Sequence, residues 1–243
     1  MKFELNLNMN LLNVLSYLLL TTMCIFSIKD SFAIDVVTES LPPYQYQQEG
    51  IIKGSAYYQV EKLLECSQLK GNYIFLPWNR AYDFALNNNN TLIFSMAKLK
   101  NREDKFVWLK VIGHTDDYIF KLKSRKDIKI TTLSDLSKWR LGLQKDDFID
   151  DMLKKKAKPL NLNIVYYQTH VQKLKMLLNN RFDLMEEESD VYGFKLKNKE
   201  FGYEKLEKLI PLTSPIPFYV AINKNSNREL ISRLKRCTDN TKE

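Results

Sequence analysis

The 243-residue sequence has few of the residues that build disulfide scaffolds, metal sites or repetitive polymers. Three cysteines are too few for a disulfide scaffold, and two histidines leave little material for a histidine-based metal site. Seven glycines and seven prolines exclude a collagen-like or low-complexity chain. Hydrophobic residues, at 44%, are too abundant for a disordered chain. The remaining class is a soluble globular protein of one or two domains.

The balance of charge is basic, because 37 lysines and arginines outnumber 29 aspartates and glutamates and give a formal net charge of +8. Such a charge would suit a nucleic-acid partner. However, residues 11–28 are strongly apolar, and Ser31 and Ala33 match the small residues that precede a signal-peptidase cut. We therefore expect residues 1–33 to be a cleavable signal peptide, with an uncleaved membrane anchor as the alternative. Export argues against nucleic acid and places the basic charge on a lysine-rich surface.

Two cysteines, Cys66 and Cys237, remain after the predicted signal peptide is removed. An even pair in an oxidising compartment favours one disulfide. Sequence alone supplies no geometry for the pair, so two free thiols remain the alternative.

Strand and helix patterns alternate along the rest of the chain. The strands are expected at residues 34–37, 72–78, 91–97, 118–122, 140–144, 163–168, 182–186 and 218–222. The helices are expected at residues 55–66, 79–86, 147–157, 171–179 and 228–237, with a short one opening at residue 132. This alternation predicts an α/β fold with parallel-rich sheets. Breaks near residues 113–117 and 212–217 predict two lobes, 34–113 with 215–243 and 114–214, joined by two crossings at a hinge.

Several short motifs occur in order along the chain. They are residues 41–44 (LPPY), 77–81 (PWNRA), 95–108 (SMAKLKNREDKFVW), 133–144 (LSDLSKWRLGLQ), 180–185 (NRFDLM) and 215–219 (PIPFY). With the short spacing of Gly50 and Gly54, they resemble the small periplasmic solute-binding proteins of the amino-acid type (extracellular solute-binding protein family 3). The resemblance covers nearly all of the mature chain. It implies a type II two-lobe clamp that closes on a small solute, acts as a monomer in the periplasm of a Gram-negative bacterium, and serves an inner-membrane ABC permease.

Arg102 follows a predicted buried strand. A guanidinium there can hold a carboxylate in a bidentate fork, and the resemblance implies that Arg102 grips the α-carboxylate of the ligand. The alternative is a surface arginine paired with Glu103 or Asp104. Ser95, near the end of the same strand, either faces the ligand with its hydroxyl or is a small residue tolerated there. The family usually has a second hydroxyl where this chain has Ala97, so one hydrogen bond to the ligand is missing.

Tyr44 and Trp78 match aromatic positions that the resemblance assigns to the ligand side chain. An aromatic face suits apolar, aromatic or cationic groups. Packing in the core is the alternative for both residues. We expect Tyr44, directly after two prolines, to be exposed to the cleft.

The second lobe departs from the family pattern at residues 145–148 (KDDF), where the family has Gly and Ser/Thr whose backbone N–H groups hold a carboxylate. Here Asp146 or Asp147 is expected to cap a helix and to repel a carboxylate. Glu188 matches an acidic position that contacts the amino group of the ligand, and strand alternation sends Glu186 to the same side. These residues form an acidic wall unless the charge run is a solvated face. We therefore expect Asp147 and Glu188 to bind a ligand with a positive group.

These residues favour a solute-binding protein over two other classes. One alternative is a degenerate clamp that binds a protein or acts as a sensory module, and the other is a dehydratase-like enzyme on the same fold. No Ser/His/Asp, Cys/His or zinc-ligand spacing accompanies His114 or His170, which are expected to be structural or solvated. We therefore expect neither catalysis, nor a metal or other cofactor, nor a nucleic-acid partner.

Overall fold

The computed structural model of the protein describes residues 32–239. The predicted signal peptide lies outside the described residues, apart from its last two positions. Within the described range, no helix is both long enough and apolar enough to cross a membrane.

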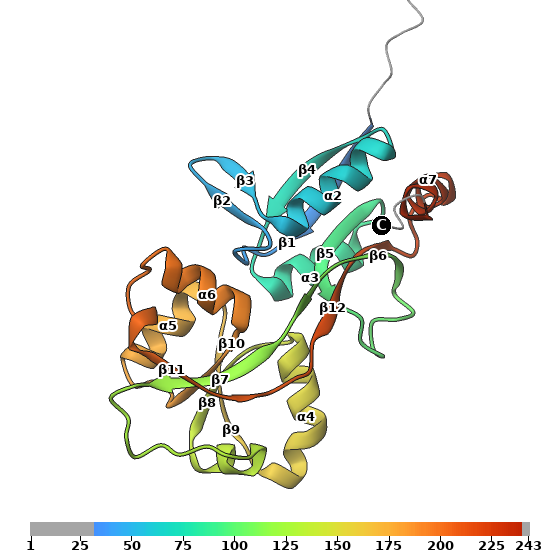
Figure 1. Cartoon of the computed structure of the whole chain (residues 1–243). Helices are drawn as coiled ribbons and strands as arrows, with labels where there is room; N and C mark the ends of the chain where they lie inside the picture. Colours follow the sequence, from blue (N-terminus) through green and yellow to red (C-terminus); the bar gives the residue numbers. More distant parts are fainter. Residues whose placement is uncertain (1–31, 240–243) are drawn as a thin grey trace, which may run out of the picture. The chain divides into compact units, whose positions relative to one another are not determined.

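The first of two five-stranded sheets has the order β4-β1-β5-β12-β6 (Figure 1). Its strands are β1 (Phe32–Thr38), β4 (Leu69–Phe75), β5 (Thr91–Ala97), β6 (Phe106–Thr115) and β12 (Ile216–Asn223). Strands β1 and β5 pair in parallel, whereas β12 is antiparallel to both β5 and β6. The helices that contact this sheet are α2 (Ser55–Cys66), α3 (Trp78–Asn87) and α7 (Arg228–Asp239). A hairpin of β2 (Tyr46–Gln48) and β3 (Ile51–Lys53) precedes α2.

The second sheet has the order β11-β7-β10-β8-β9. Its strands are β7 (Asp117–Leu122), β8 (Arg140–Gln144), β9 (Asn163–Tyr167), β10 (Leu184–Glu188) and β11 (Leu206–Pro211). Strands β8, β9 and β10 are parallel, and β7 is antiparallel to β10 and β11. The flanking helices are α4 (Phe148–Leu160), α5 (His170–Leu178) and α6 (Ser189–Lys197), with short 3-10 helices η1 (Leu133–Lys138) and η2 (Tyr203–Lys205). The chain is therefore a two-lobe α/β protein, as predicted.

The sequence patterns found the central strands of both sheets and also the edge strands β4 and β9. Strand β5 is buried along its whole length, and helix α2 and strands β5 and β8 have the predicted bounds. The sequence patterns missed β6, β11, helix α6 and the β2–β3 hairpin. Strands β6 and β11 are only partly buried and lie at sheet edges, and local patterns did not assign their apolar residues to strands.

The two chain segments that pass between the sheets lie side by side. Strand β6 ends at Thr115 and β7 begins at Asp117. At the start of β12, Ile216 pairs with Thr115 and Pro217 with His114. Figure 1 shows β12 running along β6 at this point.

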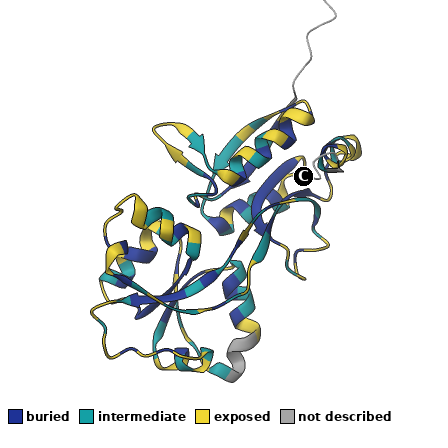
Figure 2. Cartoon of the chain, in the orientation of Figure 1, coloured by how far each residue is buried: buried dark blue, intermediate teal, exposed yellow. Residues whose placement is uncertain are grey.

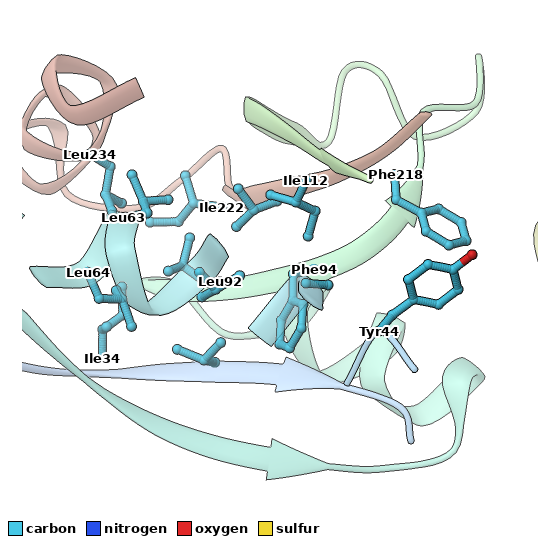
Figure 3. Packing of buried hydrophobic residues seen from close by; sticks show 14 of the residues in the cluster. Ile34, Tyr44, Leu63, Leu64, Leu92, Phe94, Ile112, Phe218, Ile222 and Leu234 are labelled. Carbon is cyan, nitrogen blue, oxygen red and sulfur yellow. The ribbon is translucent and has the colours of Figure 1, made fainter. Parts of the chain in front are cut away.

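Each sheet has its own apolar core, visible as the buried strands of Figure 2. In the first lobe, Leu63 and Leu64 of α2 pack with Leu92 of β5 and Leu234 of α7 (Figure 3). A disulfide joins Cys66 at the end of α2 to Cys237 in α7, with Cα atoms 5.8 Å apart across 171 residues of sequence. The last helix is therefore tied covalently to the first helix of the same lobe.

Candidate functional site

A small pocket lies where the carboxyl ends of the parallel strands meet. Glu39 follows β1, Ala97 ends β5, Gln144 ends β8 and Glu188 ends β10, and all four line it. This edge is where open α/β sheets bind ligands. The cavity has a volume of about 50 Å³, which is room for a few water molecules at roughly 10–15 Å³ each. Both lobes contribute to its wall.

The structure brings together five of the six predicted ligand-binding residues. The pocket is lined by Trp78, Ser95, Arg102, Asp147 and Glu188. Five further polar lining residues, which the sequence patterns did not assign to a ligand, are Glu39, Thr115, Asp117, Gln144 and His170. Each of these five lies at or next to the end of a strand or the start of a helix. The strand order of the two sheets would have placed them at one edge.

Tyr44 does not line the pocket, and the expectation that it is exposed to the cleft is wrong. Its side chain belongs to the first-lobe core, with 6% of its surface exposed. The ring packs edge-on against Phe218 with centroids 5.8 Å apart (Figure 3). Its hydroxyl is 3.3 Å from the carbonyl oxygen of His114 and 3.0 Å from Asp190 Oδ2. Tyr44 therefore binds, through its hydroxyl, to the segment at His114 that passes between the lobes and to Asp190 in the second lobe.

The loop that carries Tyr44 lies directly against the start of α2, and Gly54 allows this close approach. The carbonyl oxygen of Tyr44 accepts hydrogen bonds from the backbone N–H groups of Ala56, at 2.9 Å, and Tyr57, at 3.2 Å. A Cβ atom at Gly54, whose φ is +124°, would overlap that carbonyl group. Only glycine therefore allows the loop to lie against the start of α2.

The pocket is strongly acidic. Its ionisable lining groups are the carboxylates of Glu39, Asp117, Asp147, Glu186 and Glu188, the guanidinium of Arg102 and the imidazole of His170. Asp146, which was expected to join this acidic wall, is not part of the lining, and 56% of its side chain is exposed.

Crowding of carboxylates in a buried site changes their protonation. Burial, together with repulsion by Glu186, raises the pKa of Asp117 to about 8. Burial raises the pKa of Asp147 and of Glu188 in the same direction, with added repulsion from Glu186 and Asp117 respectively. A cation that enters the pocket would favour the ionised form of these groups.

The run Glu186 to Glu188 is buried, so the alternative that it is a solvated face is wrong. Glu186 and Glu188 line the pocket, whereas Glu187 accepts hydrogen bonds from Lys173 Nζ at 2.8 Å and Tyr203 Oη at 3.0 Å. Burial would lower the pKa of Lys173, but Glu186 and Glu187 outweigh burial and raise it. The buried ammonium in turn lowers the pKa of Glu187 against the effect of burial. The fully buried ammonium of Lys173 therefore stabilises strand β10 through Glu187, the residue of the run that does not line the pocket.

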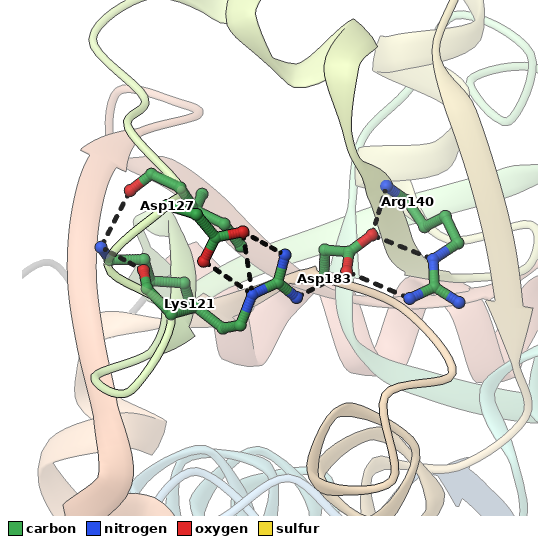
Figure 4. Close-up of polar contacts among 6 residues, drawn as sticks. Lys121, Asp127, Arg140 and Asp183 are labelled. Atoms are coloured by element: carbon green, nitrogen blue, oxygen red, sulfur yellow. Dashed lines mark hydrogen bonds and ion pairs between the residues drawn. The ribbon is translucent and has the colours of Figure 1, made fainter.

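Asp183 fixes the start of this strand (Figure 4). Its carboxylate accepts hydrogen bonds from Arg140 Nε at 2.9 Å, from the Arg140 backbone N–H at 3.0 Å and from Arg125 Nη1 at 2.8 Å. The hydrogen bond from Arg140 is the main reason that the pKa of Asp183 is lowered. Lys121 Nζ donates to the carbonyl oxygen of Arg125 at 3.0 Å and extends the network. The network ties β10 to β8 at the end opposite the pocket.

Arg102 is buried, with 4% of its surface exposed, so it is not a surface arginine paired with Glu103 or Asp104. Its guanidinium lies over the rings of Trp78, at 5.5 Å, and Tyr82, at 5.1 Å. Its Nη2 donates to the main-chain oxygen of Asp146, in the second lobe, at 3.0 Å. Arg102 therefore bridges the two lobes beside the pocket.

A second contact between the lobes lies on the other side of the pocket. Gln144 Nε2 donates to Glu39 Oε2 at 3.0 Å. His170 Nε2 lies 3.5 Å from the same oxygen. These contacts place the lobes around the cavity in a closed arrangement.

Several buried atoms of the pocket have no hydrogen-bond partner within the described part of the chain. They include Arg102 Nη1, Trp78 Nε1 and Glu188 Oε2. Leaving a buried polar group unpaired costs about 1–3 kcal/mol. A ligand with a donor for Glu188 and an acceptor for Arg102 would satisfy these groups. Over residues 32–239, no group of three or more His, Cys, Asp or Glu side chains is arranged to hold a metal ion.

No protein-family model matches the sequence, and no curated protein sequence matches it. Solved structures do match. An ancestral arginine-binding protein bound to arginine is 18% identical, with 86% of this chain and 92% of that chain covered and a TM-score of 0.73. A periplasmic binding protein of Salmonella typhimurium with high arginine specificity is 15% identical, with coverage of 86% and 93% and a TM-score of 0.72. The chain has the two-lobe fold of periplasmic binding proteins.

The binding-protein fold is also shared by a protein of another kind. A histidine kinase sensor domain with similarity to periplasmic binding proteins is 13% identical, with 86% of this chain and 89% of that chain covered and a TM-score of 0.72. These similarities concern the fold, whereas the ligand depends on the residues that line the pocket of this chain.

Proposed function

We propose that the chain is an exported solute-binding protein that closes on a small solute with a positively charged group. In this proposal the lobes are residues 34–113 with 215–243 and residues 114–214. The observation that carries it is the charge of the pocket, where five carboxylates face one guanidinium. A cation would offset the repulsion among buried carboxylates, whereas an anion would increase it.

Each lining residue has a role in this proposal. Glu188 Oε2, which has no partner within the described residues, accepts a hydrogen bond from the ammonium group. Arg102 Nη1 donates to an oxygen of the ligand. The ring of Trp78, already in contact with Arg102, forms one wall, and Ser95 and Asp147 complete the two sides. Because the contacts come from both lobes, binding favours the closed arrangement.

Delivery to a transporter is part of the same proposal. The structural neighbours include periplasmic binding proteins, which supports export by residues 1–33 into the periplasm of a Gram-negative bacterium. We propose that the protein acts as a monomer and presents its solute to an inner-membrane ABC permease. The neighbours in the comparison are binding proteins and a sensor domain, which supports binding without catalysis.

A second candidate function is sensing. One neighbour is the sensor domain of a histidine kinase, and this chain departs from the amino-acid-binding pattern at Ala97 and Asp147. In that case the closed form would contact a signalling protein instead of a permease. Cross-linking in cells, with and without a bound amine, would distinguish the two partners.

The proposal is tested by calorimetry on protein purified from the periplasm. We expect saturable binding of lysine, arginine or putrescine, weaker binding of glutamine and none of glutamate. Glu188→Gln should weaken binding of the cationic solute at least about tenfold, because an amide cannot supply the charge of the carboxylate. Glu229→Gln, on the exposed face of α7, is the matched control and should leave binding unchanged. Tighter binding of glutamate than of lysine would contradict the proposal.

A further inference from the structure

We infer that the pocket takes small aliphatic amines that carry no carboxylate, an inference that rests on the proposed function of the same site. Four groups near the pocket could hold the carboxylate of an amino acid. They are the side chains at positions 95, 97 and 102 and the start of helix α4. In this chain each of them is missing, used elsewhere or blocked by an acidic side chain.

The hydroxyl groups of the first lobe are not free for a carboxylate. Ser95 Oγ donates to Gln45 Oε1 at 2.7 Å, and both side chains are buried. Ala97, two residues further along β5, has no hydroxyl. A carboxylate beside this strand would therefore lack a side-chain hydroxyl donor, unless the bond between Ser95 and Gln45 broke.

The start of helix α4 is occupied by the protein's own carboxylates. Asp147 Oδ1 accepts a hydrogen bond from the backbone N–H of Asp150 at 2.7 Å. Asp150 Oδ2 accepts from the backbone N–H of Asp146 at 2.9 Å and pairs with Lys154 Nζ at 2.7 Å. Because Asp147 also lines the pocket, an acidic side chain already occupies the helix start that would otherwise attract a carboxylate.

Arg102 can offer only part of its fork. Nη2 donates to the carbonyl oxygen of Asp146, so a single terminal nitrogen, Nη1, remains without a partner in the described part of the chain. With Nη2 held against Asp146, the guanidinium is less free to form the two parallel hydrogen bonds of strong carboxylate binding, and the N–H groups of Nη1 can bind a neutral oxygen or a water molecule.

The opposite end of the pocket has an open acceptor for an ammonium group. Glu188 is buried, with 9% of its surface exposed, and its Oε2 has no hydrogen-bond partner among the described residues. Asp117 and Glu186 line the same side. The cavity volume of about 50 Å³ favours a short ligand. The hydroxyl of Ser95 and the start of α4 are engaged within the protein where a carboxylate would bind, whereas Glu188 Oε2 is free where an amine would bind.

Matched pairs of ligands that differ only in the α-carboxylate test this inference on the periplasmic protein. The pairs are ornithine and putrescine, lysine and cadaverine, and arginine and agmatine, each titrated by calorimetry. We expect at least one amine to bind, and each amine that binds to be at least about tenfold tighter than its amino acid, because the amino acid adds a charge of the same sign as Asp147.

A substitution at Asp147 tests whether its charge causes the preference for amines over amino acids. Asp147→Asn keeps a side-chain oxygen to cap α4 but removes its charge, so the ratio of amine affinity to amino-acid affinity should fall. Asp146→Asn, whose side chain is exposed and does not line the pocket, is the control and should leave the ratio unchanged. Amino acids that bind as tightly as their amines would overturn this inference alone. Absence of binding by both members of every pair would overturn it together with the proposed function.

Discussion

Gly54 is a residue at which a single added carbon is incompatible with the local backbone. Its φ of +124° is rarely adopted by other residues, and a Cβ would overlap the carbonyl group of Tyr44. We expect Gly54→Ala to lower the free energy of unfolding by about 1–3 kcal/mol, measured by urea denaturation. Gly193→Ala, in α6, is the matched control, because a Cβ there meets no atom within 4 Å. Equal losses in the two variants would contradict this explanation.

Asp183 stabilises the second lobe through charge-assisted hydrogen bonds from Arg125 and Arg140. We expect Asp183→Asn to lower the free energy of unfolding by about 1–2 kcal/mol at pH 7, because both arginines are partly exposed and screened. The folded-state pKa of Asp183 is lowered. Its contribution is therefore complete above the unfolded pKa of about 4, declines below that pH and is lost as the pH falls through the folded value.

Denaturation at pH 7 and at pH 3 measures this dependence. The loss caused by Asp183→Asn should shrink at the lower pH. Asp127→Asn is the control, because Asp127 pairs with the same Arg125 but 54% of its side chain is exposed. We expect no measurable loss in that variant, and a loss as large as that of Asp183→Asn would contradict the role of burial.

At the scale of elements, the sequence identified the central strands and two edge strands, β4 and β9. Strands β5 and β8 are rich in apolar residues because most of their length is buried. The edge strands β6 and β11 depend on pairing partners far away in sequence, and local patterns contain no information on that pairing. The fold class was therefore predictable, whereas the mixture of parallel and antiparallel pairs was not.

The same distinction applies to the site. Glu188 was chosen because it matches an acidic position of the resembled family, and Asp147 because it lies at the start of a predicted helix. Glu39 and Asp117 were missed because only the strand order shows that both residues reach one pocket. Tyr44 was misplaced because the motif around it does not reveal Phe218, which contributes the other half of their aromatic contact.

The disulfide between Cys66 and Cys237 stabilises the packing of helices α2 and α7 in the first lobe. It encloses a loop of 171 residues, so it restricts the unfolded chain strongly. We expect the paired variant Cys66→Ser with Cys237→Ser to lose about 2–5 kcal/mol of unfolding free energy, measured by denaturant titration. A reducing agent should lower the stability of the natural protein by a similar amount and leave the variant unchanged. No effect of reduction would contradict a bridged pair.

At the scale of the whole molecule, ligand binding and proton binding should compete. The pKa of Asp117 is raised to about 8, and those of Asp147 and Glu188 are also raised. For such groups the stabilisation of the ligand-free protein is complete below the unfolded pKa and is lost as the pH rises through the folded value. A bound amine favours the ionised forms, so its stabilising effect should grow between pH 6 and pH 8.

Thermal unfolding with and without putrescine at pH 6, 7 and 8 measures this competition. The shift in melting temperature caused by putrescine should increase with pH. Asp117→Asn should flatten the increase, whereas Glu229→Gln, on the surface of α7, should not. A shift that decreases with pH would contradict the acidic site.

The central position of β12 in the first sheet determines the order in which the molecule can assemble. The chain is synthesised from its N-terminus, and β5 and β6 lack their shared neighbour until residues 216–223 are made. All strands of the second sheet lie between residues 117 and 211, so they can pair earlier. We therefore expect the second lobe to fold first, and the first lobe to complete its sheet only when the last strand has been made. Cys237 follows β12, so the disulfide with Cys66 forms as the final step. It locks a first lobe whose sheet lacked a central strand until then.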